Sequence, residues 1–234
     1  MSTQVEVTRR ECIIDLLRGT NRKGMDALIA YLEDEGFFTS PASTKFHGAY
    51  PGGLAEHSLR VFDLLQGYSN EIDLVTATRP GQKPIPIEYN NIIIAGLLHD
   101  VCKVGAYIGT ESPYKWNKQQ PFGHALLSIE RLKCFIGLKE LEVMMIRFHM
   151  GIYGLREFYE EDSSEYRTHA EYPLRGDHSK DRKLTKEQSQ KARYGQSMRN
   201  AWYHNPICKL MYFCDELATM QETRGGEIEN QQTV

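Results

Sequence analysis

The sequence has no hydrophobic run long enough to cross a membrane, no paired cysteine motif and no excess of basic residues. A membrane-spanning helix needs about 20 apolar residues, and residues 1–10 are too polar for a signal peptide. The five cysteines show no CxxC spacing, which favours reduced thiols in a cytoplasmic protein over a cysteine-ligated zinc site. The net charge of −3 argues against extended nucleic-acid binding, for which proteins use basic surfaces.

Common catalytic motifs are also missing. The chain contains no Gly-rich phosphate-binding loop ending in Gly-Lys-Ser or Gly-Lys-Thr, no HExxH zinc motif and no GxSxG nucleophile turn. What is present is the composition of an ordinary globular protein, with 41% hydrophobic and 25% charged residues. The 234 residues are enough for one substantial domain with its own core.

Apolar residues recur at three- and four-residue spacing through most of the chain, as they do on the buried face of a helix. This spacing predicts helices over residues 8–18, 24–35, 54–68, 88–102, 124–136, 138–150 and 205–221. A proline-rich connector at 78–87 and a polar stretch at 153–190 interrupt them, and a loop as long as the second is usually functional or disordered. We therefore predict one all-α domain over residues 1–234, with a helical extension at 1–44, a core at 45–220 and a frayed tail at 224–234.

The dipeptide His99-Asp100 ends an apolar run that starts at Ile92. Such a run belongs in a protein core, where an ionised carboxylate is found paired or bound to a metal. Lys103 follows three residues after Asp100, on the same side of the predicted helix. It would either neutralise a phosphoryl oxygen or lie in solvent, where the helix dipole favours a cation near the C-terminus.

Other residues of metal-ligating type lie on predicted helices: His57, His124, His149 and Asp215. Each histidine alone also fits a structural role, as a buried core residue or as a residue at a helix start. The carboxylate of Asp215 has fewer such explanations because its helix is strongly apolar. Together with the His99-Asp100 pair, these residues form a mixed nitrogen and oxygen set, which suits a metal site inside a helical bundle.

These residues resemble the His…His-Asp…Asp signature of the HD superfamily of metal-dependent phosphohydrolases, and the resemblance covers residues 45–220. The stretches Tyr50–Ser58 and Leu97–Lys103 are similar to those of HD domains in bacterial 3′→5′ exoribonucleases and in phage-encoded HD hydrolases. Pro121–His124 and Ile146–Gly151 resemble the extra histidine motifs of the branch that binds two metals. The resemblance implies a single HD-domain helical bundle with a long polar loop insertion.

The same resemblance implies one or two bound divalent metal ions, and manganese, iron, nickel and cobalt suit these ligand types. One ion would be held by His57, His99, Asp100 and Asp215. Asp100 would bridge to a second ion, completed by His124 and His149. A hydroxide between the ions would attack phosphorus while Lys103 polarises the phosphate, so Asp100 and Lys103 are the expected catalytic residues.

The expected substrate is a small phosphorylated molecule, with a nucleotide as the first expectation. The expected phosphate contacts are His47, Lys103, Arg156 and Arg175. The two arginines lie in the stretch 153–190, which would either close as a lid or form a solvated charged loop. Two alternatives stay open: a phosphodiesterase or nuclease acting on short RNA or cyclic oligonucleotides, and a non-catalytic HD module that senses a nucleotide. The sequence indicates no membrane partner and leaves the oligomeric state open.

Overall fold

The computed structural model describes residues 4–77, 87–121, 123–151, 153–154 and 186–232. In these ranges the α-helices are α1 (Gln4–Gly19), α2 (Met25–Asp34), α3 (Gly53–Ala77), α4 (Tyr89–Leu98), α5 (His124–Lys133), α6 (Glu140–Phe148), α8 (Lys186–His204) and α9 (Pro206–Gln232). A 3-10 helix, η1 (Val101–Lys103), follows α4, and two short strands, β1 (Tyr107–Ile108) and β2 (Lys115–Trp116), pair antiparallel. The predicted all-α fold class is therefore confirmed.

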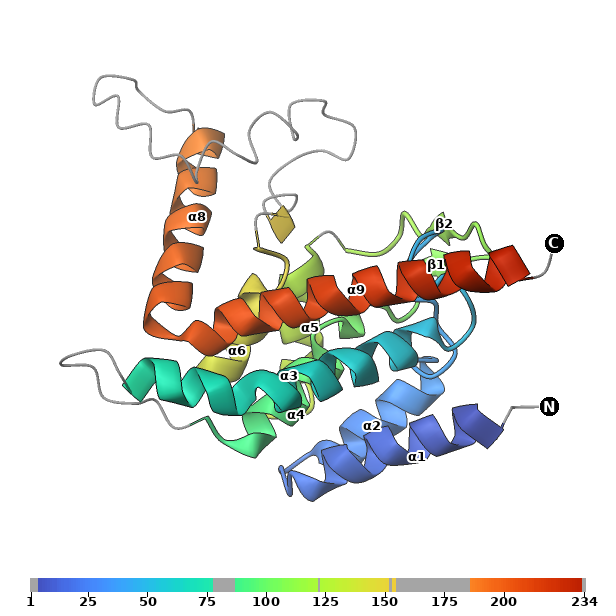
Figure 1. Ribbon diagram of the computed structural model, residues 1–234, viewed down its shortest axis with the longest axis horizontal. Helices are drawn as coiled ribbons and strands as arrows, with labels where there is room; N and C mark the ends of the chain where they lie inside the picture. Colours follow the sequence, from blue (N-terminus) through green and yellow to red (C-terminus); the bar gives the residue numbers. More distant parts are fainter. Residues whose placement is uncertain (1–3, 78–86, 122, 152, 155–185, 233–234) are drawn as a thin grey trace.

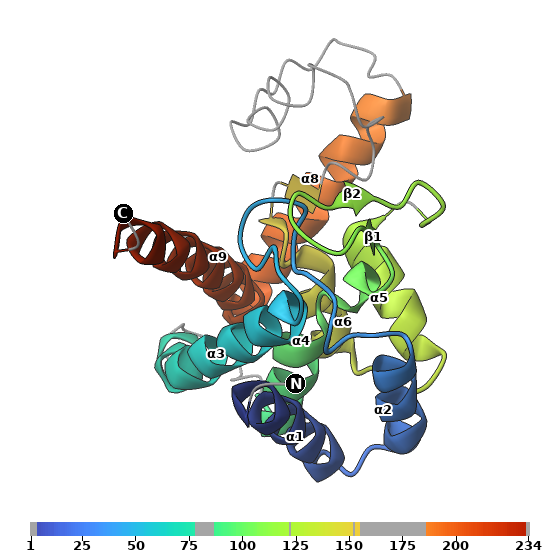
Figure 2. The same ribbon diagram turned by 90° about the vertical axis from the view of Figure 1, so that its right-hand side faces the viewer.

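The helices form a bundle around α3 and α4 (Figure 1). α3 packs lengthwise against α9 and also against α4, and α6 contacts both α4 and α9. The hairpin of α1 and α2 lies beside α3 and α4, and α8 projects from the bundle near the start of α9 (Figure 2). In the described residues, no helix is both long enough and apolar enough to cross a membrane.

The close packing of α3 against α4 depends on Gly96. A Cβ atom at this position would lie 2.9 Å from the Cα atom of Phe62 in α3, so a larger residue would push the two helices apart. The residues from Asn91 to Leu98 are all buried, as the apolar run predicted. This packing places the C-terminal end of α4 beside the first turns of α3, where the rings of His57 and His99 lie 5.5 Å apart.

The end of α4 differs from the prediction. The helix was expected to continue to residue 102, but it ends at Leu98, with His99 as its C-cap. Asp100 has φ −105° and ψ 17°, outside the helical region, and η1 starts at the next residue. The His99-Asp100 pair therefore lies at the end of α4, directly before η1.

The C-terminal third of the chain is more helical than its polar sequence indicated. α8 starts at Lys186, inside the stretch 153–190 that was expected to be a loop, because Met198 and Ala201 pack against Phe148 of α6. α9 extends to Gln232 through most of the expected frayed tail at 224–234. Much of the proline-rich connector and residues 155–185 lie outside the described residues.

A buried ion pair joins the N-terminal helices to the core. Glu142 in α6 is fully buried and accepts hydrogen bonds from Nη1 and Nη2 of Arg22, at 2.5 and 2.7 Å. It also accepts hydrogen bonds from Nδ2 of Asn91 at 3.0 Å and from the backbone N–H of Lys139 at 2.8 Å. We refer to Arg22, Asn91, Lys139 and Glu142 as the Glu142 cluster.

Candidate metal centre

Six side chains meet where the ends of α4, α5 and α6 converge beside α3 and α9. They are the six residues predicted as metal ligands from the sequence, His57, His99, Asp100, His124, His149 and Asp215, and we call them the Asp100 cluster. His99 and His149 are the C-caps of α4 and α6, and His124 is the first residue of α5. Three helix termini thus deliver imidazoles to one place.

The Asp100 cluster is buried at its centre and open at one side. The side chains of His57 and His99 are fully buried, and that of Asp100 is 2% exposed. Exposure rises to 14% at Asp215 and 23% at His124. A ligand from solvent would therefore reach the cluster from the side of these last two residues.

The two oxygens of Asp100 face two different pairs of histidines. Oδ1 lies 2.7 Å from Nε2 of His124 and 3.6 Å from Nε2 of His149. Oδ2 lies 3.5 Å from Nε2 of His99 and 3.8 Å from Nε2 of His57. A carboxylate placed between two imidazole pairs in this way has the arrangement of a bridging ligand.

Asp215 adds a second carboxylate to one of these pairs. Its Oδ1 lies 3.0 Å from Nε2 of His57 and 3.7 Å from Nε2 of His99. The donors divide into one group with two histidines and two carboxylates and another with two histidines and the shared Asp100. Mixed imidazole and carboxylate donors suit divalent manganese, iron, cobalt or nickel.

The rings of His99 and His149 are held by backbone carbonyls. Nδ1 of His99 donates to the carbonyl of Gly96 at 3.0 Å, and Nδ1 of His149 donates to the carbonyl of Ile146 at 2.6 Å. These carbonyls belong to the last helical turns, where carbonyl groups lack intrahelical partners. Because the carbonyls occupy Nδ1, Nε2 is in both rings the nitrogen left to face the cluster.

A metal ion fits this donor set. Nε2 of His99 and Nε2 of His149 are buried and have no hydrogen-bond partner. Buried polar atoms of this kind are rare and require an explanation such as an absent ion. Three overlapping groups of three side chains lie close enough for their donor atoms to share one ion: His57, His99 and Asp100; His99, His149 and Asp215; Asp100, Cys102 and His124.

Cys102 was not predicted to lie at the site. Its buried Sγ is 3.2 Å from Nδ1 of His124, and its backbone N–H donates to Oγ of Ser128. The sequence placed this cysteine among the reduced core thiols. Its position two residues after Asp100 was the only signal of proximity in the sequence.

Two histidines of the cluster are protonated because they face anions. Burial lowers the pKa of His57, but hydrogen bonds to Asp215 and Glu222 outweigh burial and raise the pKa to about 9. Burial also lowers the pKa of His124, and the neighbouring Cys102 and Asp100 raise it to about 10. A metal ion that binds these rings must displace their protons.

The two carboxylates of the cluster stay ionised despite their burial. Burial disfavours the charge of Asp100, yet Lys103 and the nearby histidines hold its pKa well below the usual value. Burial likewise raises the pKa of Asp215, but the hydrogen bond from His57 and the nearby ring of His99 outweigh burial and hold this pKa well below its usual value. The site therefore offers anionic oxygens at neutral pH.

Lys103 lies inside the site and not in solvent. Its Nζ is 2.6 Å from Oδ2 of Asp100 and the residue is 9% exposed. Burial lowers the pKa of Lys103, but the charge of Asp100 dominates and raises it above its usual value. A permanent cation thus lies beside the oxygen that faces His57 and His99.

The other predicted phosphate contacts are only partly placed. The ring of His47 lies 5.2 Å from that of His57, and burial followed by the charge of Lys103 lowers its pKa to about 3, so that it is neutral. His47 therefore borders the cluster, as its closeness in sequence to His57 predicted. Arg156 and Arg175 lie outside the described residues.

Glu222 is a second site residue that sequence reasoning missed. Its Oε1 lies 3.2 Å from Nδ1 of His57, and its side chain is 3% exposed. Glu222 follows Asp215 by seven residues, which is two helical turns, so both carboxylates lie on the same face of α9. That spacing was visible in the sequence.

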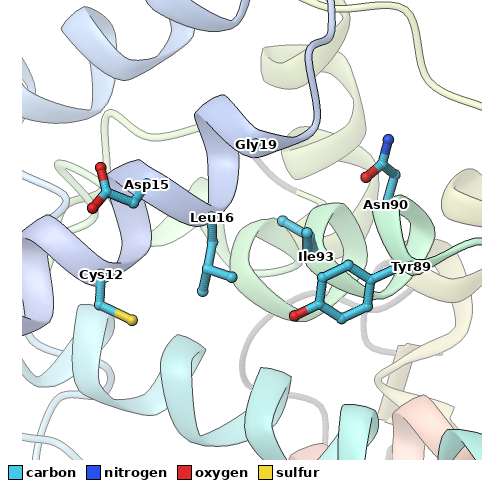
Figure 3. Close-up of a pocket in the computed structure, with 7 residues that line it drawn as sticks. All are labelled: Cys12, Asp15, Leu16, Gly19, Tyr89, Asn90 and Ile93. Carbon is cyan, nitrogen blue, oxygen red and sulfur yellow. The ribbon is translucent and has the colours of Figure 1, made fainter.

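The described cavity lies elsewhere. It has a volume of about 410 Å³ and is lined by Cys12, Asp15, Leu16, Gly19, Tyr89, Asn90 and Ile93, from α1 and α4. Figure 3 shows the carboxylate of Asp15 directed away from the ring of Tyr89, so the polar groups do not converge on one point. This cleft has no donor set comparable with that of the Asp100 cluster.

Comparison with known families gives one match. Residues 54–187, more than half of the chain, match the HD domain family. The matched range contains every member of the Asp100 cluster except Asp215. No curated protein and no solved structure was found to match the chain.

Proposed function

The chain belongs to the HD domain family, and we propose that it is a metal-dependent phosphohydrolase that cleaves a phosphoester bond in a small phosphorylated molecule, a nucleotide in the first instance. One observation carries this proposal: the two oxygens of Asp100 each face a pair of histidine Nε2 atoms. Members of this family are generally hydrolases, and the six proposed ligands lie together in the Asp100 cluster.

The proposed ligands form two sets that share Asp100. The first set is His57, His99, Asp215 and Oδ2 of Asp100, and the second is His124, His149 and Oδ1 of Asp100. Manganese, iron, cobalt and nickel are the proposed metals. When bound, such ions supply Lewis acidity toward a phosphoryl oxygen and lower the pKa of water.

The chain's own residues have distinct proposed roles. Asp100 orients both sets of donors, since it is the member common to them. The ammonium group of Lys103 contacts a phosphoryl oxygen and balances its charge, because it lies buried beside Oδ2 of Asp100. His47 borders the same space and, being neutral, offers a hydrogen bond to the substrate. Arg156 and Arg175 are proposed as further phosphate contacts.

Two other functions remain as competitors. A phosphodiesterase or nuclease acting on short RNA or cyclic oligonucleotides would use the same donors, but the chain has no basic excess for a long polyanion. A nucleotide-sensing module would not need a complete ligand set. The six donors together therefore favour hydrolysis of a small substrate.

A substrate screen with defined metals tests the proposal. The purified chain is assayed with Mn²⁺ or Co²⁺ against nucleoside mono-, di- and triphosphates, cyclic dinucleotides and short RNA. We expect metal-dependent phosphate release from a nucleotide, abolished in Asp100→Asn and unchanged in Asp26→Asn, whose carboxylate is exposed and distant. Nucleotide binding without hydrolysis would instead identify a sensing module, and an absence of metal binding would overturn the proposal.

A further inference from the structure

The buried carboxylate of Glu222 lies directly behind His57, on the side of the ring away from the cluster. Nδ1 of His57 donates to Oε1 of Glu222 at 3.2 Å, while Nε2 of the same ring is 3.0 Å from Oδ1 of Asp215. The imidazole is therefore held between two carboxylates of α9. One faces the proposed metal position and the other does not.

His57 differs in this respect from the other histidines of the Asp100 cluster. Nδ1 of His99 and Nδ1 of His149 donate to backbone carbonyls, and Nδ1 of His124 contacts the thiol of Cys102. In the described residues, His57 is the member whose Nδ1 faces a carboxylate. A carboxylate is the strongest of these acceptors because it is charged.

The neighbours of Glu222 satisfy only one of its two carboxylate oxygens. Its side chain is 3% exposed, and Oε2 is buried without a hydrogen-bond partner. Nε of Arg60 lies 3.4 Å from Oε1, in an ion pair without hydrogen-bond geometry at Nε. Burying an ionised carboxylate with half of its acceptor capacity unused is costly. A cationic imidazole or a metal-bound imidazole at His57 would offset this cost.

We propose that Glu222 is a positioning residue that keeps the proton of His57 on Nδ1 and thereby leaves Nε2 free to bind a metal ion. The carboxylate also makes Nε2 a stronger donor, since it stabilises the positive charge that the ring acquires on metal binding. This inference rests on the proposed function. It adds to the Asp100 cluster a residue outside the range that matches the HD domain family.

Arg60, which pairs with Glu222, is itself paired with Glu56. Nη2 of Arg60 lies 3.2 Å from Oε1 of Glu56, and Oε2 of Glu56 lies 2.6 Å from Nη2 of Arg9 in α1. Arg60 thus reaches Glu222 while being anchored by Glu56. These ion pairs connect Arg9 in α1 with Glu222 and, through it, with the proposed metal ligand His57.

Metal affinity tests the proposal without relying on activity. Co²⁺ is titrated into metal-free wild type, Glu222→Ala, Glu222→Gln and the control Gln221→Ala, which changes an exposed neighbour on α9. Loss of a carboxylate behind a metal-bound histidine typically weakens binding 10–100-fold. We expect about this loss in Glu222→Ala, a smaller loss in Glu222→Gln, which retains a neutral acceptor, and no change in Gln221→Ala.

The protonated nitrogen of His57 supplies the second measurement. Nitrogen-15 NMR of the Co²⁺-free, Zn²⁺-loaded protein should show a hydrogen-bonded Nδ1–H in the wild type and a weaker hydrogen-bonded shift in the isosteric variant Glu222→Gln, whose amide oxygen is a neutral acceptor. If wild type binds Co²⁺ and both Glu222 variants bind it equally well, the role of Glu222 is overturned and the proposed function stands. If wild type binds no divalent ion, the proposed function itself falls.

Discussion

The protein buries two groups of charged side chains, and they differ in whether their hydrogen-bonding capacity is used. In the Glu142 cluster both carboxylate oxygens are hydrogen-bonded, to two nitrogens of Arg22, to Asn91 and to a backbone N–H. In the Asp100 cluster the Nε2 atoms of His99 and His149 are buried without hydrogen bonds. The hydrogen-bonding capacity of the Glu142 carboxylate is filled by protein groups, whereas the Asp100 cluster needs a bound ligand to fill its own.

This difference separates a structural ion pair from a binding site. A buried pair is tolerated when every polar atom is satisfied, and it then holds its elements in one arrangement. The Glu142 cluster does so for the α1–α2 turn, α4 and α6. The centre of the Asp100 cluster is also buried but contains unsatisfied acceptors, which is destabilising unless a ligand supplies the missing contacts.

The largest effect on stability is expected when the Glu142 cluster loses its arginine. Arg22→Met leaves the carboxylate of Glu142 buried without its cation, and we expect a loss of about 3–5 kcal/mol in the free energy of unfolding. Urea unfolding of the metal-free protein measures it. The control is Arg18→Met, whose partner Asp26 is 90% exposed, and whose loss should stay below about 1 kcal/mol. Equal losses would show that the Glu142 cluster is not the structural element inferred here.

A divalent metal ion should stabilise the folded protein by binding to the Asp100 cluster alone. At Mn²⁺ concentrations about 100 times the dissociation constant, the free energy of unfolding should rise by about 2.7 kcal/mol. His99→Ala should lose this gain, whereas Arg22→Met should keep it, since distant sites contribute additively. Urea unfolding with and without Mn²⁺ gives both values. A gain that survives in His99→Ala would place the ion outside the Asp100 cluster.

Substitution of Lys103 should cost less stability than substitution of Arg22, although both residues pair with a buried carboxylate. In Lys103→Gln, the protonated His57 and His124 still balance Asp100, so the metal-free protein should lose less stability than Arg22→Met. Hydrolysis should fall about 10–100-fold, or about 1.4–2.7 kcal/mol of transition-state stabilisation. Co²⁺ affinity should not fall, because the ammonium group competes with the ion for Oδ2 of Asp100. A parallel loss of affinity and turnover would make Lys103 a structural partner of Asp100.

Helix periodicity was enough to predict the fold class and to place six candidate ligands on helices that meet. His57 was expected in the core because it lies three residues after Leu54 and so shares its helix face, and His99 because it ends the apolar run that starts at Ile92. The same reasoning could have reached Glu222, which shares the face of Asp215. It was missed because the helix predicted over 205–221 ended one residue before Glu222, whereas α9 continues to Gln232.

Contacts between segments far apart in the chain could not be predicted from the sequence. α4 ends at Leu98 and Asp100 leaves the helical conformation, although the apolar spacing continues as far as Val101 and Cys102. Cys102 reaches His124 because η1 packs against α5, and the predicted helix over 124–136 gave no indication of this contact. α8 was missed because its few apolar positions pack against Phe148, a tertiary contact that outweighs a polar composition.

The smallest effect is that of pH on stability. The free energies of unfolding of the metal-free and metal-bound protein should move apart as pH rises. The raised pKa of His57, about 9 against an ordinary 6.5, stabilises the metal-free fold fully below pH 6.5, and this contribution is lost as pH rises through 9. Metal binding needs the neutral ring, so metal affinity should rise in the same window, by up to about tenfold per pH unit for each proton released, or about 1.4 kcal/mol. Urea unfolding at about pH 6.5, 7.5 and 8.5, with and without Mn²⁺, measures the difference between the two free energies of unfolding. Arg22→Met should show the same widening difference, since the Glu142 cluster contains none of the titrating histidines. Curves that stay parallel in the wild type would mean that the ion does not displace the proton of His57, and would separate this ring from the first ligand set.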